Sequence, residues 1–569
     1  MAHIVVDPVT RIEGHLRVEA EVDGGVVKEA WSSSTMFRGI ELILRGRDPR
    51  DAWAFAQRIC GVCTTVHAIA SIRAVEKAIG AVPPPNARIL RNLIMAAQAV
   101  HDHVVHFYHL HALDWVDIVS ALDADPAKTS SLAQSISDWP LSSTNYFSGV
   151  RTRIKAFIER GQLGIFANAY WGHPAYRLPP EANLMAVAHY LEALDFQRRF
   201  IKIHALLGGK NPHPQSFLVG GMATPVDPDS QSALNMDTIT ALDALVADGM
   251  AFVSRVYLPD VLAIASYYKD WASIGTGIGN YMAYGDYPED DSENPQLFFP
   301  TGVIHNRNLA NIETVDHAKI TEQIAHSWYD YSVGDDKGLN PYKGETSPHY
   351  TGPKPPFERL DVAQKYSWLK SPRYDDAAME VGPLARMLVA YSTGRPTRVK
   401  VLVDKVLKTL GVGPEALFST LGRIAARAIE TQVLVESMDR WVRDLAENMA
   451  RREYRIQDNS KWDPASWPRD CLGAGFHEAP RGALGHWVHI SNGSIANYQC
   501  VVPSTWNAGP RDASGHPGPY EAALVGTPVA KPEQPLEILR TVHSFDPCMA
   551  CGVHVVDATK RELARVRVM

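Results

Sequence analysis

Residues 58–68 read RICGVCTTVHA, and residues 546–554, near the end of the chain, read DPCMACGVH. Each stretch holds a Cys-x-x-Cys pair followed by a histidine; the four cysteines are Cys60, Cys63, Cys548 and Cys551. Thiolates are soft donors that suit nickel, iron or zinc, and two such pairs supply four of them. The pattern therefore predicts that a thiolate-bound transition metal joins the two ends of a single folded body.

Two other interpretations of the four cysteines stay open at this point. A structural zinc site would use the same residues, although zinc ribbons are local units and these pairs lie most of the chain apart. Two separate redox motifs are the second alternative, although neither pair follows a strand in a thioredoxin-like βαβ context. The chain has only six cysteines, too few for a disulfide scaffold.

Composition and charge exclude several classes of protein. Hydrophobic residues make up 46% of the chain and charged residues 21%, which is typical of a soluble globular protein. The net charge of −7 provides no field that would attract nucleic acid. No run of about 18 apolar residues is present, so we expect no membrane-spanning helix. The first residues, MAHIVVDPVTRIEGH, lack the cationic start and apolar core of a signal peptide.

Apolar periodicity predicts a mainly α, α+β fold: a large helical body with small antiparallel β elements near both ends. Alternating residues on either side of Asp23-Gly24-Gly25 predict an N-terminal hairpin, and Asp48-Pro49 predicts a helix start. Helices are expected over residues 60–80, 88–122, 178–207, 230–268 and 383–450. The first of these would place Cys60, Cys63 and His67 on one face. We expect residues 270–375 to be irregular and residues 460–535 to mix short strands with loops.

Five histidines lie within HDHVVHFYHLH, residues 101–111. His103, His106 and His109 recur every three residues and could form a stripe on a helix. We interpret them as core or proton-route residues rather than a second metal site, because the fixed spacing to a carboxylate or cysteine that metal motifs show is missing.

Seven motifs together resemble the large subunit of a nickel–iron (NiFe) hydrogenase, from residue 4 to the end of the chain. They are RIEGH (11–15), FRGIE (37–41), RICGVC (58–63) with His67, GGKNPHP (208–214), APRGALGHW (479–487), QCVVPSTWN (499–507) and DPCMACGVH (546–554). The resemblance implies that the chain cleaves H₂ reversibly into protons and electrons.

The resemblance also implies the ligands of the metal centre. All four thiolates would bind nickel, and Cys63 and Cys551 would bridge to an iron that carries two cyanides and one carbon monoxide. Arg481 would lie over the open face of the metals and contact one cyanide, which suits its fixed array of donors. Pro503 and Ser504 would hold the other cyanide.

Further residues carry supporting roles by the same resemblance. His67 would hydrogen-bond toward the site, while Asp102 and Asp546 would hold Arg481. Glu13 would receive the proton, since a carboxyl group can relay it. The base that first takes this proton is left open between Arg481 and the Cys548 thiolate.

A magnesium site is implied as well, formed by Glu41, the backbone carbonyl of Cys500 and His554. Hard oxygen ligands suit Mg²⁺, and a histidine nitrogen is an unusual addition. Only the carbonyl of Cys500 is needed, so a cysteine at this position preserves the role.

The electrons must leave through another chain, because no further cysteine set here can hold an iron–sulfur cluster. The resemblance implies a small subunit with iron–sulfur clusters, and His213 would face the nearest one. The motifs look most like the membrane-bound uptake group, which implies a cytochrome b reached through the small subunit. The pair would then lie at the periplasmic face of the membrane, exported by the signal of the small subunit.

The family pattern divides the chain into a single body, residues 1–554, and an extension, residues 555–569. A maturation protease would cut between His554 and Val555 once nickel is bound. This extension argues against the alternative of a hydrogen sensor, since such relatives typically end at the histidine. Non-catalytic relatives lack the four cysteines, and a zinc-stabilised scaffold is the remaining alternative.

Overall fold

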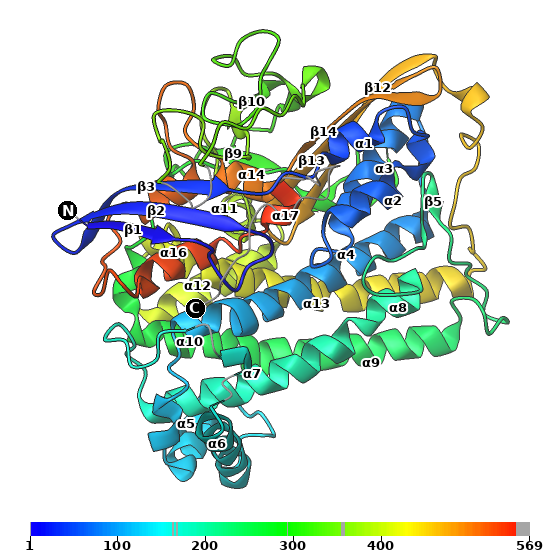
Figure 1. The fold of residues 1–569 in the computed structure, drawn as a ribbon. Helices are drawn as coiled ribbons and strands as arrows, with labels where there is room; N and C mark the ends of the chain where they lie inside the picture. Colours follow the sequence, from blue (N-terminus) through cyan, green and yellow to red (C-terminus); the bar gives the residue numbers. More distant parts are fainter. Residues whose placement is uncertain (1, 162–163, 167–168, 293, 354–358, 553–569) are drawn as a thin grey trace.

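The computed structural model describes residues 2–161, 164–166, 169–292, 294–353 and 359–552. Long helices build the body of the protein, and two three-stranded antiparallel sheets lie above it in Figure 1. The fold is mainly α with small sheets near both ends of the chain, as the periodicity predicts.

The N-terminal sheet contains β1 (Ala2–Val6), β2 (Leu16–Asp23) and β3 (Val26–Ser34), in that order. Asp23 pairs with Val26, and Gly24 and Gly25 have φ values of 59° and 74°, so the predicted glycine turn is confirmed. Polar positions of β2 are nevertheless buried: Arg17 donates to Glu19, and both side chains are inside the protein. The central strand β2 is therefore covered on both faces along most of its length, which its alternating pattern does not indicate.

The predicted helical segments have different limits in the structure, and several of them divide into two or more helices. The helix expected from residue 60 is α3 and begins only at Val66 (Val66–Ile79). The helix expected over 88–122 is α4 (Pro85–Val105), which continues as a π-helical segment, η3 (His106–His111), before shorter turns. The segment 383–450 contains α11 (Pro383–Thr393), α12 (Thr397–Leu410) and α13 (Thr420–Ala450). Left-handed glycines end α11 and α12 because they adopt this conformation without strain.

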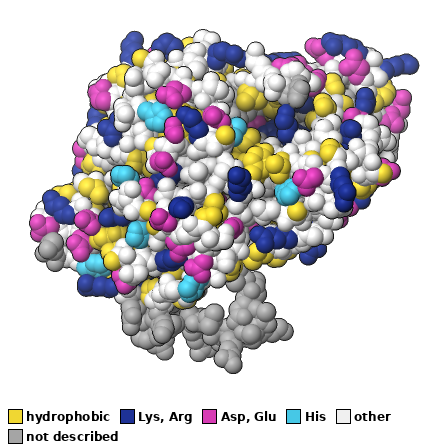
Figure 2. Space-filling model, turned by 90° about the horizontal axis from the view of Figure 1, so that it is seen from above, with side chains coloured by type: hydrophobic (Ala, Val, Ile, Leu, Met, Phe, Trp, Pro, Cys, Tyr) yellow, Lys and Arg dark blue, Asp and Glu magenta, His cyan; other side chains and the backbone are white. Residues whose placement is uncertain are grey.

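The remaining expected helices also form. They are α7 (Pro180–Phe200), α8 (Lys202–Gly208), α9 (Met236–Phe252) and α10 (Leu258–Tyr267). The segment 270–375 adds short two-stranded ladders, including β10 (Ile320–Gln323) with β11 (Ser371–Tyr374). On the face in Figure 2, side chains of both charges are interspersed among apolar ones. No helix within the described ranges is long and apolar enough to cross a membrane.

The C-terminal sheet consists of β12 (Asp470–Ala479), β13 (Gly482–Ser491) and β14 (Ser494–Val501), which are longer strands than the sequence predicts. Helix α3 packs directly on β12, where Gly475 leaves no room for a side chain: an added Cβ would lie 2.1 Å from the carbonyl oxygen of Ala70. This close approach brings the first cysteine pair, just before α3, near the β12–β13 turn with Arg481.

Replacing Gly475 by alanine is therefore expected to destabilise the protein. Overpacking costs about 1–3 kcal/mol and here involves the helix backbone, which cannot rotate away. Gly149→Ala is the control, because its added Cβ, on α6 (Thr144–Glu159), would meet nothing within 4 Å. It should stabilise by about 1 kcal/mol through helix propensity. Thermal unfolding midpoints measure both, and equal shifts of the same sign would contradict the packing argument.

Candidate metal centre

The four thiols of the two cysteine pairs meet at one point inside the protein. Their sulfur atoms all lie within 4.8 Å of one another, and all four residues are buried. Cys63 Sγ lies 2.9 Å from Cys551 Sγ, and Cys60 Sγ lies 3.6 Å from Cys548 Sγ. Sulfur ligands about 2.3 Å from one metal lie up to about 4.6 Å apart, which is close to the spread of the four sulfur atoms here.

The first pair is shaped by a turn rather than by a helix. Cys60 has extended backbone angles, and the backbone N–H groups of Val62 and Cys63 both donate to its Sγ at 3.3 Å. The prediction that Cys60, Cys63 and His67 share a helix face is therefore wrong, because α3 begins after both cysteines. The turn bends both thiols inward, which a helix spacing alone would not do.

The thiols titrate as a group. Hydrogen bonds from the other three thiols lower the pKa of Cys60 well below its ordinary range, whereas burial raises the pKa of Cys548 and Cys551 well above theirs. Four thiolates without a cation would repel one another in a buried site. A bound cation compensates this charge and holds all four deprotonated.

Glu13 fixes the second cysteine pair through both its backbone and its side chain. Its N–H donates to Pro547 O at 3.3 Å, and Met549 N donates to Glu13 O at 2.8 Å. Its carboxylate Oε2 accepts from Ala550 N at 3.0 Å and lies 3.5 Å from Cys548 Sγ. Burial, together with the nearby Cys60 charge, raises the pKa of Glu13. The carboxyl group therefore lies beside the cluster and binds a proton more readily than an exposed glutamate does.

Gly14 allows this approach between the two ends of the chain. Its φ is +81°, and an added Cβ would lie 2.6 Å from Ala550 N. Any other residue would separate the two segments.

Arg481, in the β12–β13 turn, is held by two carboxylates. It donates from Nε to Asp546 O and from Nη2 to Asp546 Oδ1, both at 3.0 Å, and from Nη1 to Asp102 Oδ2 at 3.4 Å. Burial lowers the pKa of Arg481, but Asp546 and the other anions raise it well above its usual value overall. The guanidinium is thus a fixed cation and hydrogen-bond donor.

A small cavity of about 10 Å³ lies between these groups. Cys63, Cys548, Cys551, Arg481, Pro503 and Ser504 are among its lining residues. Helix α14 (Pro503–Ala508) begins there, and Ser504 Oγ accepts from Cys548 N at 3.0 Å. The cavity has an apolar wall with polar donors at its edge, which suits small, weakly polar ligands.

Comparison with known proteins agrees with this geometry. The profile of the Nickel-dependent hydrogenase family matches residues 38–554, and a HoxL-like profile matches residues 3–33. The chain belongs to the nickel-dependent hydrogenase family. It is 54% identical to the uptake hydrogenase large subunit of Rhizobium leguminosarum bv. viciae, over 99% of this chain and 97% of that protein. It is 49% identical to the Hydrogenase-1 large chain of Escherichia coli, with the same coverage.

Solved hydrogenases have the same fold. The Ni-Fe-Se hydrogenase of D. vulgaris Hildenborough has a TM-score of 0.76 and 35% identity, over 97% of this chain and 100% of that one. That of Dm. baculatum has a TM-score of 0.75 and 34% identity, over 97% and 100%. This hydrogenase thus catalyses the cleavage of H₂ at a site that contains nickel and iron.

In this hydrogenase the His67 ring lies at the edge of the cavity and contacts His486, with 3.0 Å between Nδ1 and Nε2. His486 in turn contacts the Tyr498 hydroxyl at 2.7 Å, and burial lowers the pKa of His486 to about 3. Sequence reasoning missed His486 and Tyr498, although His486 lies inside the APRGALGHW motif. A neutral His486 continues the hydrogen-bond chain that begins at His67.

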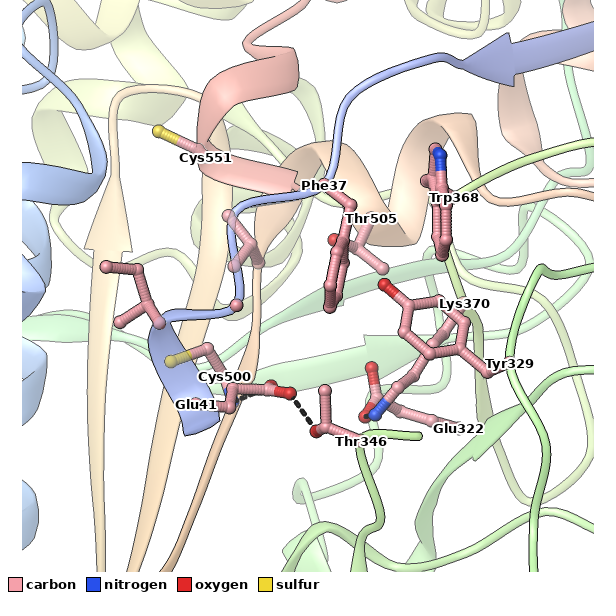
Figure 3. A pocket seen from close by; sticks show the side chains of 13 residues that line it. Phe37, Glu41, Glu322, Tyr329, Thr346, Trp368, Lys370, Cys500, Thr505 and Cys551 are labelled. Atoms are coloured by element: carbon pink, nitrogen blue, oxygen red, sulfur yellow. Dashed lines mark hydrogen bonds and ion pairs between the residues drawn. The ribbon is translucent and has the colours of Figure 1, made fainter. Parts of the chain in front are cut away.

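Glu41, on α1 (Ile40–Leu44), lines a second cavity of about 30 Å³ beside Cys551 (Figure 3). Its carboxylate accepts from Cys500 N at 2.9 Å and from the Thr346 hydroxyl. His554 lies outside the described residues. Sequence reasoning missed Thr346, Glu322 and Lys370, which come from the segment predicted to be irregular and have no motif to mark them.

The cavity also contains a buried ion pair. Lys370 Nζ lies 3.2 Å from Glu322 Oε2 and 3.1 Å from Gln499 Oε1. Burial nevertheless raises the pKa of Glu322 to about 7. Oxygen donors therefore surround this cavity on several sides, in contrast to the sulfur donors of the first.

His213 contacts the turn that contains the first cysteine pair. Its Nε2 donates to the carbonyl oxygen of Cys60 at 2.9 Å, and its N–H donates to the Thr64 hydroxyl. The residue is only partly buried, so it connects the cluster with the surface.

The histidines of residues 101–111 have separate partners. His103 lies 3.5 Å from Glu430, His106 contacts His543 O at 2.7 Å, and His109 contacts Tyr190 O at 3.3 Å. Among the described residues, the four cysteines are the one group of three or more His, Cys, Asp or Glu side chains close enough to bind a metal together.

Proposed function

We propose that the chain is the catalytic large subunit of an uptake hydrogenase, with residues 1–554 as its mature body. The observation that supports this most directly is the cluster of four buried thiols within 4.8 Å. Such soft anionic donors fit nickel through Cys60 and Cys548, and nickel shared with iron through Cys63 and Cys551. When bound, the metal pair supplies an open coordination position at which H₂ is polarised and split heterolytically.

Cys548 and Glu13 would then accept and transfer the proton. A proton on Cys548 Sγ can pass to Glu13 Oε2, which lies 3.5 Å away. Arg481 is the less suitable base, because its loss of a proton would leave the buried carboxylates of Asp102 and Asp546 without their partner. We infer that Arg481 instead stays charged and orients small anionic ligands.

The two cyanides and one carbon monoxide of the iron would lie in the cavity beside the thiols. Arg481 would donate to one cyanide, and Ser504, next to Pro503, would donate to the other. His67 borders the same cavity and would orient the thiolate shell.

The second cavity fits a magnesium ion. Glu41 supplies a carboxylate, the Cys500 carbonyl and His554 would complete the protein ligands, and waters would fill the rest. A volume of about 30 Å³ leaves room for a water-sized group between Glu41 and Cys551.

Electrons would leave to a small subunit with iron–sulfur clusters, and His213, which is bonded to the Cys60 carbonyl oxygen, would face the nearest of them. Val62, in the turn between the first two cysteines, is 37% exposed and would be covered by that subunit. Through the small subunit the enzyme would reach a membrane cytochrome b at the periplasmic face, and the small subunit would carry the export signal.

Infrared spectroscopy of the purified heterodimer tests the proposal. Bands from bound cyanide and carbon monoxide, with nickel and iron by elemental analysis, are expected. Zinc in place of nickel, without such bands, would contradict the catalytic assignment and favour a zinc-stabilised scaffold. Magnesium in the same elemental analysis tests the second cavity.

A stop codon in place of Val555 is expected to yield active enzyme without the maturation protease. Residues 555–569 carry a net charge of +2 from Lys560, Arg561, Arg565 and Arg567 against Asp557 and Glu562. We infer that they are removed once nickel is loaded and that their removal completes maturation. H₂ oxidation in a protease-deficient host measures this, with the full-length chain as the inactive control. If the truncated chain still required the protease for activity, the proposed role of the extension would be wrong.

A further inference from the structure

The backbone segment that contains Glu13 is fixed by residues that do not belong to the metal centre. Arg11, two residues before it, has a φ of 57°, a left-handed conformation that is unfavourable for a residue with a side chain. Such backbone persists only where the surroundings enforce it. The contacts of Arg11 therefore identify the groups that fix the backbone conformation of this segment.

Asp114 is the main partner of Arg11. The guanidinium Nη2 donates to Asp114 Oδ1, and Nη1 donates to Leu110 O at 2.6 Å. Asp114 lies in the short helical turn η4 (Ala112–Asp114) and has no exposed surface. Burial alone would raise the pKa of Asp114, but Arg11 and His543 lower it below its usual range.

His543, on α16 (Leu536–Ser544), links Asp114 to the backbone of Thr10. Its Nδ1 lies 2.6 Å from Asp114 Oδ2, and its Nε2 lies 2.9 Å from Thr10 O. Four residues later, Pro547 O accepts the N–H of Glu13. Thr10 and Glu13 are thus both fixed to the chain segment that leads into Cys548.

We propose that Asp114 is a positioning residue for H₂ cleavage. By holding Arg11 and His543 at once, it fixes residues 10–13 so that the Glu13 carboxyl group remains beside Cys548 Sγ. The inference rests on the proposed role of Glu13 as the proton acceptor. Asp114 is separated from the cysteines by Arg11 and His543 and touches neither metal ligands nor Glu13 in the contacts described.

The test is Asp114→Asn in the assembled, metal-loaded heterodimer. Asparagine keeps the shape but lacks the full negative charge with which Asp114 holds the Arg11 guanidinium and the His543 ring. We expect nickel, iron and the infrared bands to be unchanged, the KM for H₂ to be unchanged, and kcat to fall about 100-fold, as misplacement by about 1 Å can cause. Exchange of H₂ with D₂O should fall in parallel, and the solvent isotope effect on kcat should rise.

Asp117→Asn is the matched control. Asp117 is also buried, three residues along the chain, but the bonds that its carboxylate accepts from described residues come from the backbone N–H groups of Val119, Ser120 and Gly172. The Asp117→Asn substitution should leave the solvent isotope effect on kcat unchanged, even if it lowers the stability of the protein. A general structural role for buried aspartates would give both variants the same kinetics.

A double variant shows whether Asp114 acts through Glu13. Asp114→Asn should add little to the defect of Glu13→Gln, because residues that act as one unit are not additive. Normal kcat and isotope effect in metal-loaded Asp114→Asn would overturn the inference while leaving the role of Glu13 intact. Conversely, full activity of Glu13→Gln would refute that role itself.

His543→Asn is the second variant if Asp114→Asn does not assemble. It keeps the Arg11–Asp114 pair but loses the bond to Thr10 O. The inference predicts retained metal with lowered kcat and a raised isotope effect. Normal kinetics would overturn it, and so would failure of both variants to load metal, because the residues would then serve only the fold.

Discussion

Replacing Cys63 by serine is expected to abolish H₂ oxidation and to remove nickel and iron from the protein. Its sulfur lies 2.9 Å from that of Cys551, and both are the proposed shared ligands of the two metals. A serine hydroxyl is a harder donor and stays protonated at neutral pH, so it cannot replace a bridging thiolate. The loss should exceed the about 10–100-fold that removal of a supporting hydrogen bond costs.

Cys471→Ser is the control for this substitution. Cys471 lies on β12, opposite Ile490, and does not belong to the four-thiol group. Metal content and activity should both be retained. A Cys63→Ser variant that contained the full complement of nickel and turned over H₂ would refute the ligand assignment.

Glu13→Gln is expected to lower kcat by about 100- to 10,000-fold, the range that a general acid–base group contributes. Glutamine has the same shape, and its amide oxygen can still accept from Ala550 N, so the second cysteine pair should stay in place. Nickel, iron and the infrared bands should therefore persist. The substitution removes the carboxyl group that lies 3.5 Å from Cys548 Sγ. The amide that replaces it cannot take up and release a proton.

Exchange of H₂ with D₂O separates this effect from damage to the metals. Cleavage at intact metals without proton exit gives little exchange with solvent. Glu13→Asp should retain part of the activity with a longer proton transfer, and Glu29→Gln, exposed on β3, should behave as wild type. Rapid exchange in Glu13→Gln would contradict the proposed route.

The sequence predicted the local elements that depend on nearby residues. Asp48 caps a short helix that starts at Pro49, and the glycine turn between β2 and β3 forms, because capping and turn chemistry are local. Prediction from the sequence was wrong where contacts between distant segments determine the local structure. The turn at Cys60 replaces the expected helix, since N–H groups of Val62 and Cys63 bind the Cys60 sulfur instead of helix carbonyls.

Other groups around the metal centre had no signal that a single sequence could provide. Asp114 and His543 lie 429 residues apart, yet their side chains meet at 2.6 Å. Lys370 and Glu322 come from a region whose composition indicates only turns. Their importance depends on burial and pairing, which arise only when distant segments pack together.

The sequence by itself determined the kind of chemistry, because residue type fixes donor character: four cysteines in two pairs are soft ligands wherever they meet. Only the tertiary structure decided which groups surround them. Glu13 reaches Cys548 across 535 residues of chain, and Arg481 reaches Asp102 across 379. The physical reason is that the packing of α3 on β12, and of the N-terminal segment on the C-terminal one, is a long-range property. It places a proton acceptor and a fixed cation beside the thiols.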